Sequence, residues 1–128
     1  MVDRQFYFAG ELPFYSDYSR LKIIFSYLFS NSINFRDPQK ENQFIRVNVS
    51  TSPQQTVISV LDNGIGIAVD QIPHVFDMFV RNHESSAGAG LGLYVVKEVV
   101  EKLKGSIEID SLFGEWTRVD ITIPNSIG

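Results

Sequence analysis

Two pairs of strand-like segments, each joined by a short turn, constrain the fold of this chain more than any other feature. The first pair covers residues 45–49 and 57–61, and the second covers residues 106–110 and 117–123. Apolar and polar side chains alternate in most of these segments, which is typical of strands with one buried face. The connecting turns, near residues 52–55 and 113–115, are too short for a crossover, so we predict two antiparallel hairpins.

Helical periodicity marks the segments that precede each hairpin. The first predicted helix runs from about Tyr18 to Phe35 and ends before Pro38, and the second starts near Leu91 and is capped by Gly105. Their core-facing stripes consist of Leu21, Ile24, Phe25, Leu28, Ser32 and Phe35 in the first helix and Val95, Val96, Val99, Val100 and Leu103 in the second. A short strand at residues 5–8 comes first and suits a sheet edge.

The order of these elements predicts the fold class. We expect an α+β two-layer sandwich, in which a mixed, mostly antiparallel sheet of about five strands is covered on one face by about three helices. The third helix is a short piece near residues 72–79, within a long irregular connection from Asp62 to Gly92. The 128 residues, 44% of them hydrophobic, are enough for one domain, so we expect a single domain over residues 1–128.

Charge and cysteine content exclude several function classes. A net charge of -4 provides no basic field for nucleic acid or an anionic membrane, so we expect neither as a partner. The chain has no cysteine, which excludes disulfides, thiolate metal clusters and a cysteine nucleophile. Its longest apolar stretches are too short to span a bilayer, so direct membrane contact is not expected.

The first candidate site is the run Asp62-Asn63-Gly64-Ile65-Gly66-Ile67, which follows a buried strand. A buried carboxylate needs a partner, and the exocyclic amine of adenine is a suitable donor, whereas the carbonyl of guanine would repel it. Gly64 and Gly66 would let the backbone approach the base without a Cβ in the way. A plain tight turn remains the alternative, since Asp-Asn-Gly is common in turns.

Two further patterns complete a possible nucleotide site. The run Gly88-Ala89-Gly90-Leu91-Gly92-Leu93 leads into the second helix, whose free N-terminal amides could hold phosphate, although it could also be a flexible linker. On the first helix, Asn31 borders the apolar stripe, and its amide oxygen could bind a magnesium ion that also takes phosphate oxygens and water. A solvated surface asparagine is the alternative.

Taken together and in this order, the patterns resemble the Bergerat-fold (GHKL) ATPases, shared by gyrases, heat-shock chaperones, mismatch-repair ATPases and histidine kinases. The resemblance covers nearly the whole chain, and the catalytic ATP-binding domain of sensor histidine kinases matches best. Residues 28–35 are similar to the N box of these kinases, residues 62–67 and 88–93 to their two glycine boxes, and residues 75–81 to their F box.

The resemblance implies ATP and Mg²⁺ as ligands and a role for each matching residue. Asn31 would hold magnesium, Asp62 would read adenine, Phe35 would lie against the ring, and Arg81 would face the γ-phosphoryl group. The remaining positions implied to contact the nucleotide are Asn34, Gly64, Gly66, Ile67, Phe79, Gly88, Gly90, Leu91, Gly92, Leu93 and Thr117. Asn31 and Arg81 would be the catalytic residues.

The chain departs from the family pattern at several positions. Tyr27 occupies the place of a polar residue one turn before Asn31, so no side chain on the helix is suited to activate water for gyrase-like hydrolysis. Asn34 replaces a usual lysine or arginine, and Trp116 stands where a glycine commonly precedes Thr117. Six residues separate Arg81 from Gly88, which makes a short ATP lid.

The resemblance implies an ATP-dependent protein-histidine kinase that transfers the γ-phosphate to a histidine on a separate dimerisation domain, from which a response regulator receiver domain receives it. Neither His74 nor His83 has a phosphoacceptor context, so we expect this chain to be a fragment of a longer sensor protein. We expect this domain to lie in the cytoplasm, and such a parent protein can be anchored in the membrane. Two alternatives remain open. One is a non-catalytic nucleotide-binding or docking module, and the other is an anti-sigma-factor-type serine kinase on the same fold.

Overall fold

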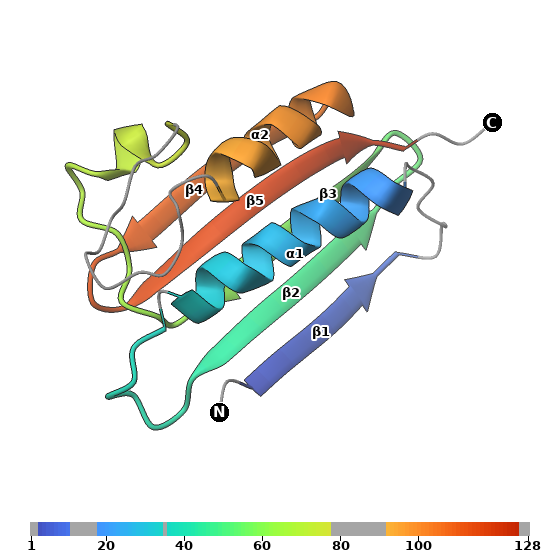
Figure 1. Ribbon diagram of the computed structural model, residues 1–128. Coiled ribbons are helices and arrows are strands. Elements are labelled where there is room, and N and C mark those ends of the chain that lie inside the picture. The colour runs from blue at the N-terminus through green and yellow to red at the C-terminus, as the bar shows by residue number, and fades with distance from the viewer. Residues whose placement is uncertain (1–2, 11–17, 35, 78–91, 126–128) are drawn as a thin grey trace.

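The computed structural model describes residues 3–10, 18–34, 36–77 and 92–125 (Figure 1). The elements in chain order are β1 (Asp3–Ala9), α1 (Tyr18–Asn34), β2 (Phe44–Thr51), β3 (Gln55–Asp62), the short 3₁₀ helix η1 (Ile72–His74), α2 (Gly92–Lys102), β4 (Ser106–Leu112) and β5 (Trp116–Pro124). Both predicted hairpins are confirmed, as β2–β3 and β4–β5, and α1 ends within one residue of its predicted boundary.

The sheet has five strands in the order β1-β2-β3-β5-β4. β1 runs parallel to β2, and the other neighbouring pairs are antiparallel, so the predicted mixed sheet is confirmed. The second hairpin joins the first through β5, which places β4 at the far edge. In this register Asp62, the last residue of β3, lies opposite Thr117 of β5.

Both α-helices lie on one face of the sheet, as Figure 1 shows, and the core fills the space between the two layers. α1 contributes Ile24 and Leu28, and α2 contributes Val96 and Val100, all of them at most 2% exposed. On β3 and β5 every second residue is buried, which gives each strand one core face. The two-layer α+β architecture predicted from the sequence is therefore confirmed.

Among the described residues, the helix count is slightly lower than predicted. The piece expected near residues 72–79 is a 3₁₀ turn over Ile72–His74, and residues 78–79 lie outside the described part of the chain. Its backbone bonds are of the i to i+3 type, with the Val75 N–H donating to the Ile72 carbonyl at 3.3 Å. This segment therefore adds a short turn rather than a third α-helix.

The C-terminus of α2 differs in detail from the prediction that Gly105 caps it. The N–H groups of Lys104 and Gly105 donate to the carbonyls of Glu101 and Val100, at 2.9 and 3.0 Å, which is the Schellman pattern. The left-handed residue of this cap is Lys104, with φ of 63°, rather than the glycine. Gly105 is needed for space, because a Cβ there would lie 2.3 Å from the Thr122 carbonyl oxygen.

β1 forms the other edge of the sheet, as predicted for the first strand. It pairs with β2 alone, and its Phe6 ring contacts Phe29 of α1 at a centroid distance of 6.0 Å. Among the described residues, no helix is both long and apolar enough to cross a membrane.

Candidate functional site

Asp62 is the centre of the candidate site, at the point where β3 ends. Its side chain is 7% exposed. The Ser32 hydroxyl of α1 donates to Asp62 Oδ2 at 3.0 Å, and the Gly64 N–H donates to Asp62 Oδ1 at 2.9 Å. The carboxylate therefore connects the first helix to the loop that follows β3.

Burial raises the pKa of Asp62 above its ordinary value, because a desolvated carboxylate disfavours its charge. The Gly64 N–H, the Ser32 hydroxyl and the positive charge of Lys40 act in the opposite direction. One carboxylate oxygen accepts the hydrogen bond from Ser32, and the other accepts the hydrogen bond from Gly64. An ionised carboxylate has about four acceptor positions. Asp62 thus keeps the capacity to accept a hydrogen bond from a ligand.

Asn63 fixes the loop of residues 62–67, which we call the Asp62 loop, to the start of β2. Its Oδ1 accepts the Phe44 N–H at 2.8 Å, and its Nδ2 donates to the Asn42 carbonyl at 2.6 Å. Asn63 thus acts as a structural side chain beside Asp62.

The other side of the Asp62 loop packs against the turn between β4 and β5. The Gly114 N–H donates to the Ile65 carbonyl at 2.6 Å, and Gly66 has a φ of 73°. A Cβ at Gly66 would lie 2.4 Å from the Leu112 carbonyl oxygen. Access of a base at Gly66 stays a prediction. The structure shows that the lack of a side chain at Gly66 lets two backbone segments meet.

Ser111 joins the Asp62 loop to β5, and sequence reasoning missed it. Its Oγ accepts the Ile67 N–H at 2.8 Å, donates to the Trp116 carbonyl at 2.6 Å and lies 3.0 Å from Thr117 Oγ1. The sequence pattern that could have identified Ser111 is the alternation of core-facing and solvent-facing residues in β4. Ser111 follows Ile107 and Ile109 on the core-facing side of this strand. Ser32 carried the same kind of signal, as a hydroxyl within an apolar stripe.

The structure brings two predicted site residues together from distant parts of the chain, because Asp62 of β3 and Thr117 of β5 are register partners. Asn31 is half-buried on α1 and directly precedes Ser32, whose hydroxyl donates to Asp62. Ile67 of the Asp62 loop is buried.

The other predicted site residues lie at the start of α2, at the end of α1, or outside the described part of the chain. Gly92 is the first residue of α2, and Leu93 is 5% exposed within the core cluster. Asn34 ends α1, and its side chain is not described. The residues outside the described part are Phe35, Phe79, Arg81, Gly88, Gly90 and Leu91.

A magnesium ion at this site would depend on few protein ligands. Within residues 3–10, 18–34, 36–77 and 92–125, no group of three or more His, Cys, Asp or Glu side chains could hold a metal. Asn31 offers an amide oxygen. Magnesium in nucleotide sites usually binds one or two protein ligands together with phosphate oxygens and water, so a single amide ligand is sufficient. The residues present are therefore compatible with a nucleotide-bound ion rather than with a metal cage.

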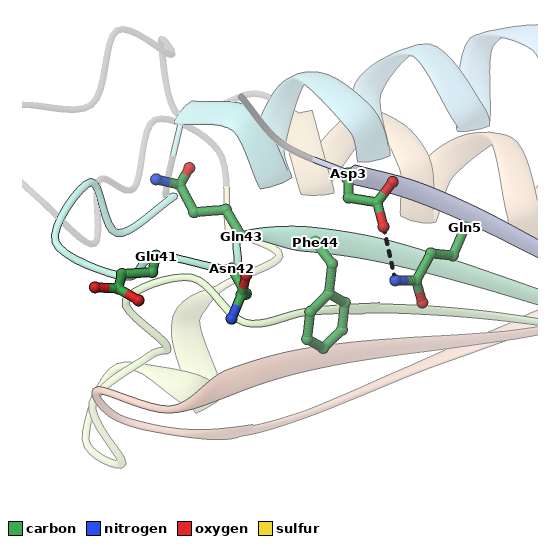
Figure 2. A pocket seen from close by; sticks show the side chains of 6 residues that line it. All are labelled: Asp3, Gln5, Glu41, Asn42, Gln43 and Phe44. Atoms are coloured by element: carbon green, nitrogen blue, oxygen red, sulfur yellow. Dashed lines mark hydrogen bonds between the residues drawn. The ribbon is translucent and has the colours of Figure 1, made fainter.

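A separate pocket of about 180 Å³ lies where β1 and β2 begin, and Figure 2 shows the side chains around it. Its lining residues are Asp3, Gln5, Glu41, Asn42, Gln43 and Phe44. Gln5 Nε2 donates to Asp3 Oδ2 at 2.9 Å along β1. Two lining residues, Asn42 and Phe44, bond through their backbone to the Asn63 side chain of the candidate site.

The chain is similar to known proteins in both sequence and structure. The family model described as "Histidine kinase-, DNA gyrase B-, and HSP90-like ATPase" matches residues 16–127. The sensor protein RprX of Bacteroides fragilis is 34% identical over 106 residues, which cover 80% of this chain and 20% of RprX. The sensor histidine kinase RppB of Synechocystis is 31% identical over 120 residues, which cover 91% of this chain and 26% of RppB. The chain spans about a quarter or less of these relatives.

Solved structures share the fold over almost the whole chain. A mycobacterial sensor histidine kinase, MprB, superposes with a TM-score of 0.80 at 24% identity, covering 97% of this chain and 84% of MprB. Full-length ShkA, solved in complex with AMPPNP, superposes with a TM-score of 0.83 at 23% identity, covering 99% of this chain and 26% of ShkA.

Proposed function

The chain belongs to the histidine kinase-, DNA gyrase B- and HSP90-like ATPases, as an ATP-binding domain of the sensor histidine kinase type, and from this premise we propose that it binds Mg-ATP and donates the γ-phosphoryl group to a histidine. The domain would be the catalytic part of a longer sensor protein, consistent with the share of its relatives that it spans. The histidine would lie on a dimerisation domain of the same or a partner chain, and a receiver domain would accept the phosphoryl group next. We propose a cytoplasmic location for this domain, where ATP is available.

The buried carboxylate of Asp62 is the observation that carries this proposal. It is held from two sides by Ser32 and Gly64 and keeps acceptor positions free. The exocyclic amine of adenine would donate to such an acceptor, whereas the guanine carbonyl at the same position would leave two acceptors facing each other. Asp62 would therefore select ATP over GTP.

The phosphate end of the nucleotide would extend toward α1 and the start of α2. Asn31 would hold a magnesium ion through its amide oxygen, and the ion would neutralise phosphate charge. The glycines at residues 88–92 would leave the amides at the start of α2 free for phosphate oxygens. Arg81 would face the γ-phosphoryl group, as the family resemblance implies.

In the proposed transfer, a nitrogen of the acceptor histidine attacks the γ-phosphorus. A nitrogen–phosphorus bond forms while the bond from that phosphorus to the bridging oxygen breaks, and ADP leaves with the electron pair. His74 belongs to the nucleotide-binding domain itself and lies 3.2 Å from Asp77 within its own turn, so the proposed acceptor is a histidine outside this domain. The domain would contribute chiefly through positioning and electrostatics.

Calorimetric titration tests the nucleotide site. We expect wild-type protein to bind ATP with magnesium and to ignore GTP, and we expect Asp62→Asn to lose most of the ATP affinity, because an amide would present its own donor group to the adenine amine. Asp70→Asn, an exposed carboxylate in the same connection, is the matched control and should bind like the wild type. Equal affinity for ATP and GTP in the wild type would contradict adenine selection by Asp62.

A non-catalytic nucleotide-binding module is the second candidate, and Tyr27 favours it. Tyr27 is 39% exposed on α1, one turn before Asn31, and cannot act as a carboxylate base. The two candidates separate when the domain is joined to a histidine-bearing hairpin and incubated with Mg-ATP. Phosphohistidine would establish the kinase, ATP binding without transfer would establish the binding module, and phosphoserine on a protein partner would indicate a serine kinase.

A further inference from the structure

Lys40 connects three segments that meet at the candidate site. It lies in the connection between α1 and β2, and its Nζ donates to the Gly64 carbonyl at 3.1 Å and to the Glu115 carbonyl at 2.9 Å. Gly64 belongs to the Asp62 loop, and Glu115 belongs to the turn between β4 and β5. One ammonium group therefore holds both sides of the site.

The turn that carries Lys40 is itself fixed by hydrogen bonds. Asp37 Oδ1 accepts the Gln39 N–H at 3.0 Å, and the Asp37 carbonyl accepts the Lys40 N–H at 3.1 Å. The Gln43 side chain donates to the Lys40 carbonyl at 3.3 Å. Because the backbone around Lys40 is already ordered, the bridge to the two carbonyls costs only the rotamer freedom of the lysine side chain.

The charge of Lys40 also acts on Asp62. Ser32 from α1 donates a hydrogen bond to Asp62, and the register partners of Asp62 are Ile45 from β2 and Thr117 from β5. None of these three side chains is charged. Among the described residues, Lys40 is the charged group that lowers the pKa of Asp62 against the effect of burial. An ionised Asp62 is the form that accepts a hydrogen bond on both oxygens.

We propose that Lys40 is a positioning residue for the adenine end of the nucleotide site, which fixes the Asp62 loop against the β4–β5 turn and places a positive charge beside the base-reading carboxylate. The proposal rests on the proposed function, since it assumes that Asp62 reads adenine. It goes further by assigning a role to a side chain outside the glycine loops. A small displacement of the Asp62 carboxylate would weaken its hydrogen bond to the base, because hydrogen bonds form only within a narrow range of distances and angles.

The first test needs no nucleotide and compares Lys40→Met with Lys40→Arg. Carbon-13 NMR titration of the Asp62 carboxyl should show a higher pKa in Lys40→Met than in the wild type, and Lys40→Arg should restore the wild-type value. Amide exchange at Gly114, which donates to Ile65, should be about tenfold faster in Lys40→Met, the effect expected from losing one hydrogen bond that carries a charge. Lys22→Met, an exposed lysine on α1, is the control and should change neither quantity.

The second test measures ATP affinity as a function of pH. Lys40→Met should weaken Mg-ATP binding by about tenfold at neutral pH and should move the acidic loss of binding to higher pH, whereas a purely structural tether would weaken binding equally at every pH. If Lys40→Met does not fold, Lys40→Gln replaces it, because glutamine keeps a neutral donor and removes the charge.

The outcomes separate this proposal from the proposed function. If wild-type protein binds ATP and the Lys40 variants leave the affinity and the pH profile unchanged, Lys40 is not a positioning residue. If wild-type protein does not bind ATP, the proposed function fails. In that case an altered Asp62 pKa and faster Gly114 exchange in Lys40→Met would still support the tether, and unchanged values would overturn it.

Discussion

At the scale of single residues, two buried polar side chains on the core face of β3 have opposite environments. Asp62, at one end, accepts hydrogen bonds from Ser32 and Gly64. Thr56, near the other end, is 0% exposed, and its hydroxyl has no hydrogen-bond partner among the described residues. A buried polar group without a partner costs stability, so Thr56 weakens the fold, whereas Asp62 belongs to the site.

Replacement of Thr56 by valine should therefore stabilise the protein. Thr56→Val keeps the shape and removes the unpaired hydroxyl, and we expect a gain of about 1–2 kcal/mol in the free energy of unfolding by urea denaturation. Thr117→Val is the matched control, because Thr117 is also buried but lies 3.0 Å from the Ser111 hydroxyl. It should lose about 1 kcal/mol, and a gain in both variants would show that the hydrogen bond at Thr117 contributes nothing.

Replacement of Asp62 by asparagine should change how stability depends on pH. Burial raises the pKa of Asp62 in the folded state above its ordinary value of 3.8. Between these two pKa values the folded state therefore binds more protons than the unfolded state. The contribution of Asp62 to stability is complete below pH 3.8 and is lost as pH rises through the folded-state pKa.

Urea denaturation across the acidic to neutral range checks this prediction. Asp62→Asn should become progressively more stable relative to the wild type as pH rises, until the difference levels off above the folded-state pKa. A difference that stays constant with pH would show that burial does not raise the pKa of Asp62.

At the scale of secondary-structure elements, the end of α2 offers a direct test of its cap. Lys104 has a left-handed backbone, which costs a residue with a Cβ about 1 kcal/mol relative to glycine. Lys104→Gly should therefore raise the free energy of unfolding by about 0.5–1 kcal/mol in thermal or urea denaturation.

The control for this cap is a glycine placed inside the same helix. Glu98→Gly, at an exposed position of α2, should lower stability by about 1 kcal/mol. Destabilisation of similar size by Lys104→Gly would mean that the left-handed conformation of Lys104 is not strained. Gly105→Ala should also destabilise, because its Cβ would meet the Thr122 carbonyl oxygen at 2.3 Å.

Most elements could be predicted because their signal is local. The inward alternation of β2 and the helical stripe of α1 lie within single segments, and each element begins and ends close to the expected residues. The short helical piece predicted near residues 72–79 is present in its described part as the 3₁₀ helix η1, so only the helix count is slightly lower than expected. A short segment has too few residues for its sequence pattern to distinguish a 3₁₀ helix from an α-helix. In η1 the backbone hydrogen bonds are of the i to i+3 type.

At the scale of the whole molecule, the candidate site combines parts that are far apart in the chain. Ser32, Asp62 and Thr117 come from α1, β3 and β5, so the site exists only in the folded state. A ligand that binds only the folded state stabilises it by mass action, and ATP at ten times its dissociation constant should add about 1.4 kcal/mol.

Thermal unfolding with increasing Mg-ATP checks this coupling. We expect the Tm of the wild type to rise by about 5 °C when ATP is present at ten times its dissociation constant. The Tm should continue to rise with the logarithm of the ATP concentration. Asp62→Asn should show little change at the same concentrations. An equal rise in both proteins would indicate that the nucleotide binds away from Asp62.

The sequence by itself determined the element types, the α+β class and the residues of the Asp62 loop, because hydrophobic period and turn chemistry act over a few neighbouring residues. Tertiary structure alone decided that β5 inserts beside β3 and places Thr117 opposite Asp62, and that Ser32 and Lys40 reach the same loop. Strand order and side-chain hydrogen bonds of this kind depend on how distant segments pack. No local pattern encodes that packing, because the partners become neighbours only when both helices cover the sheet.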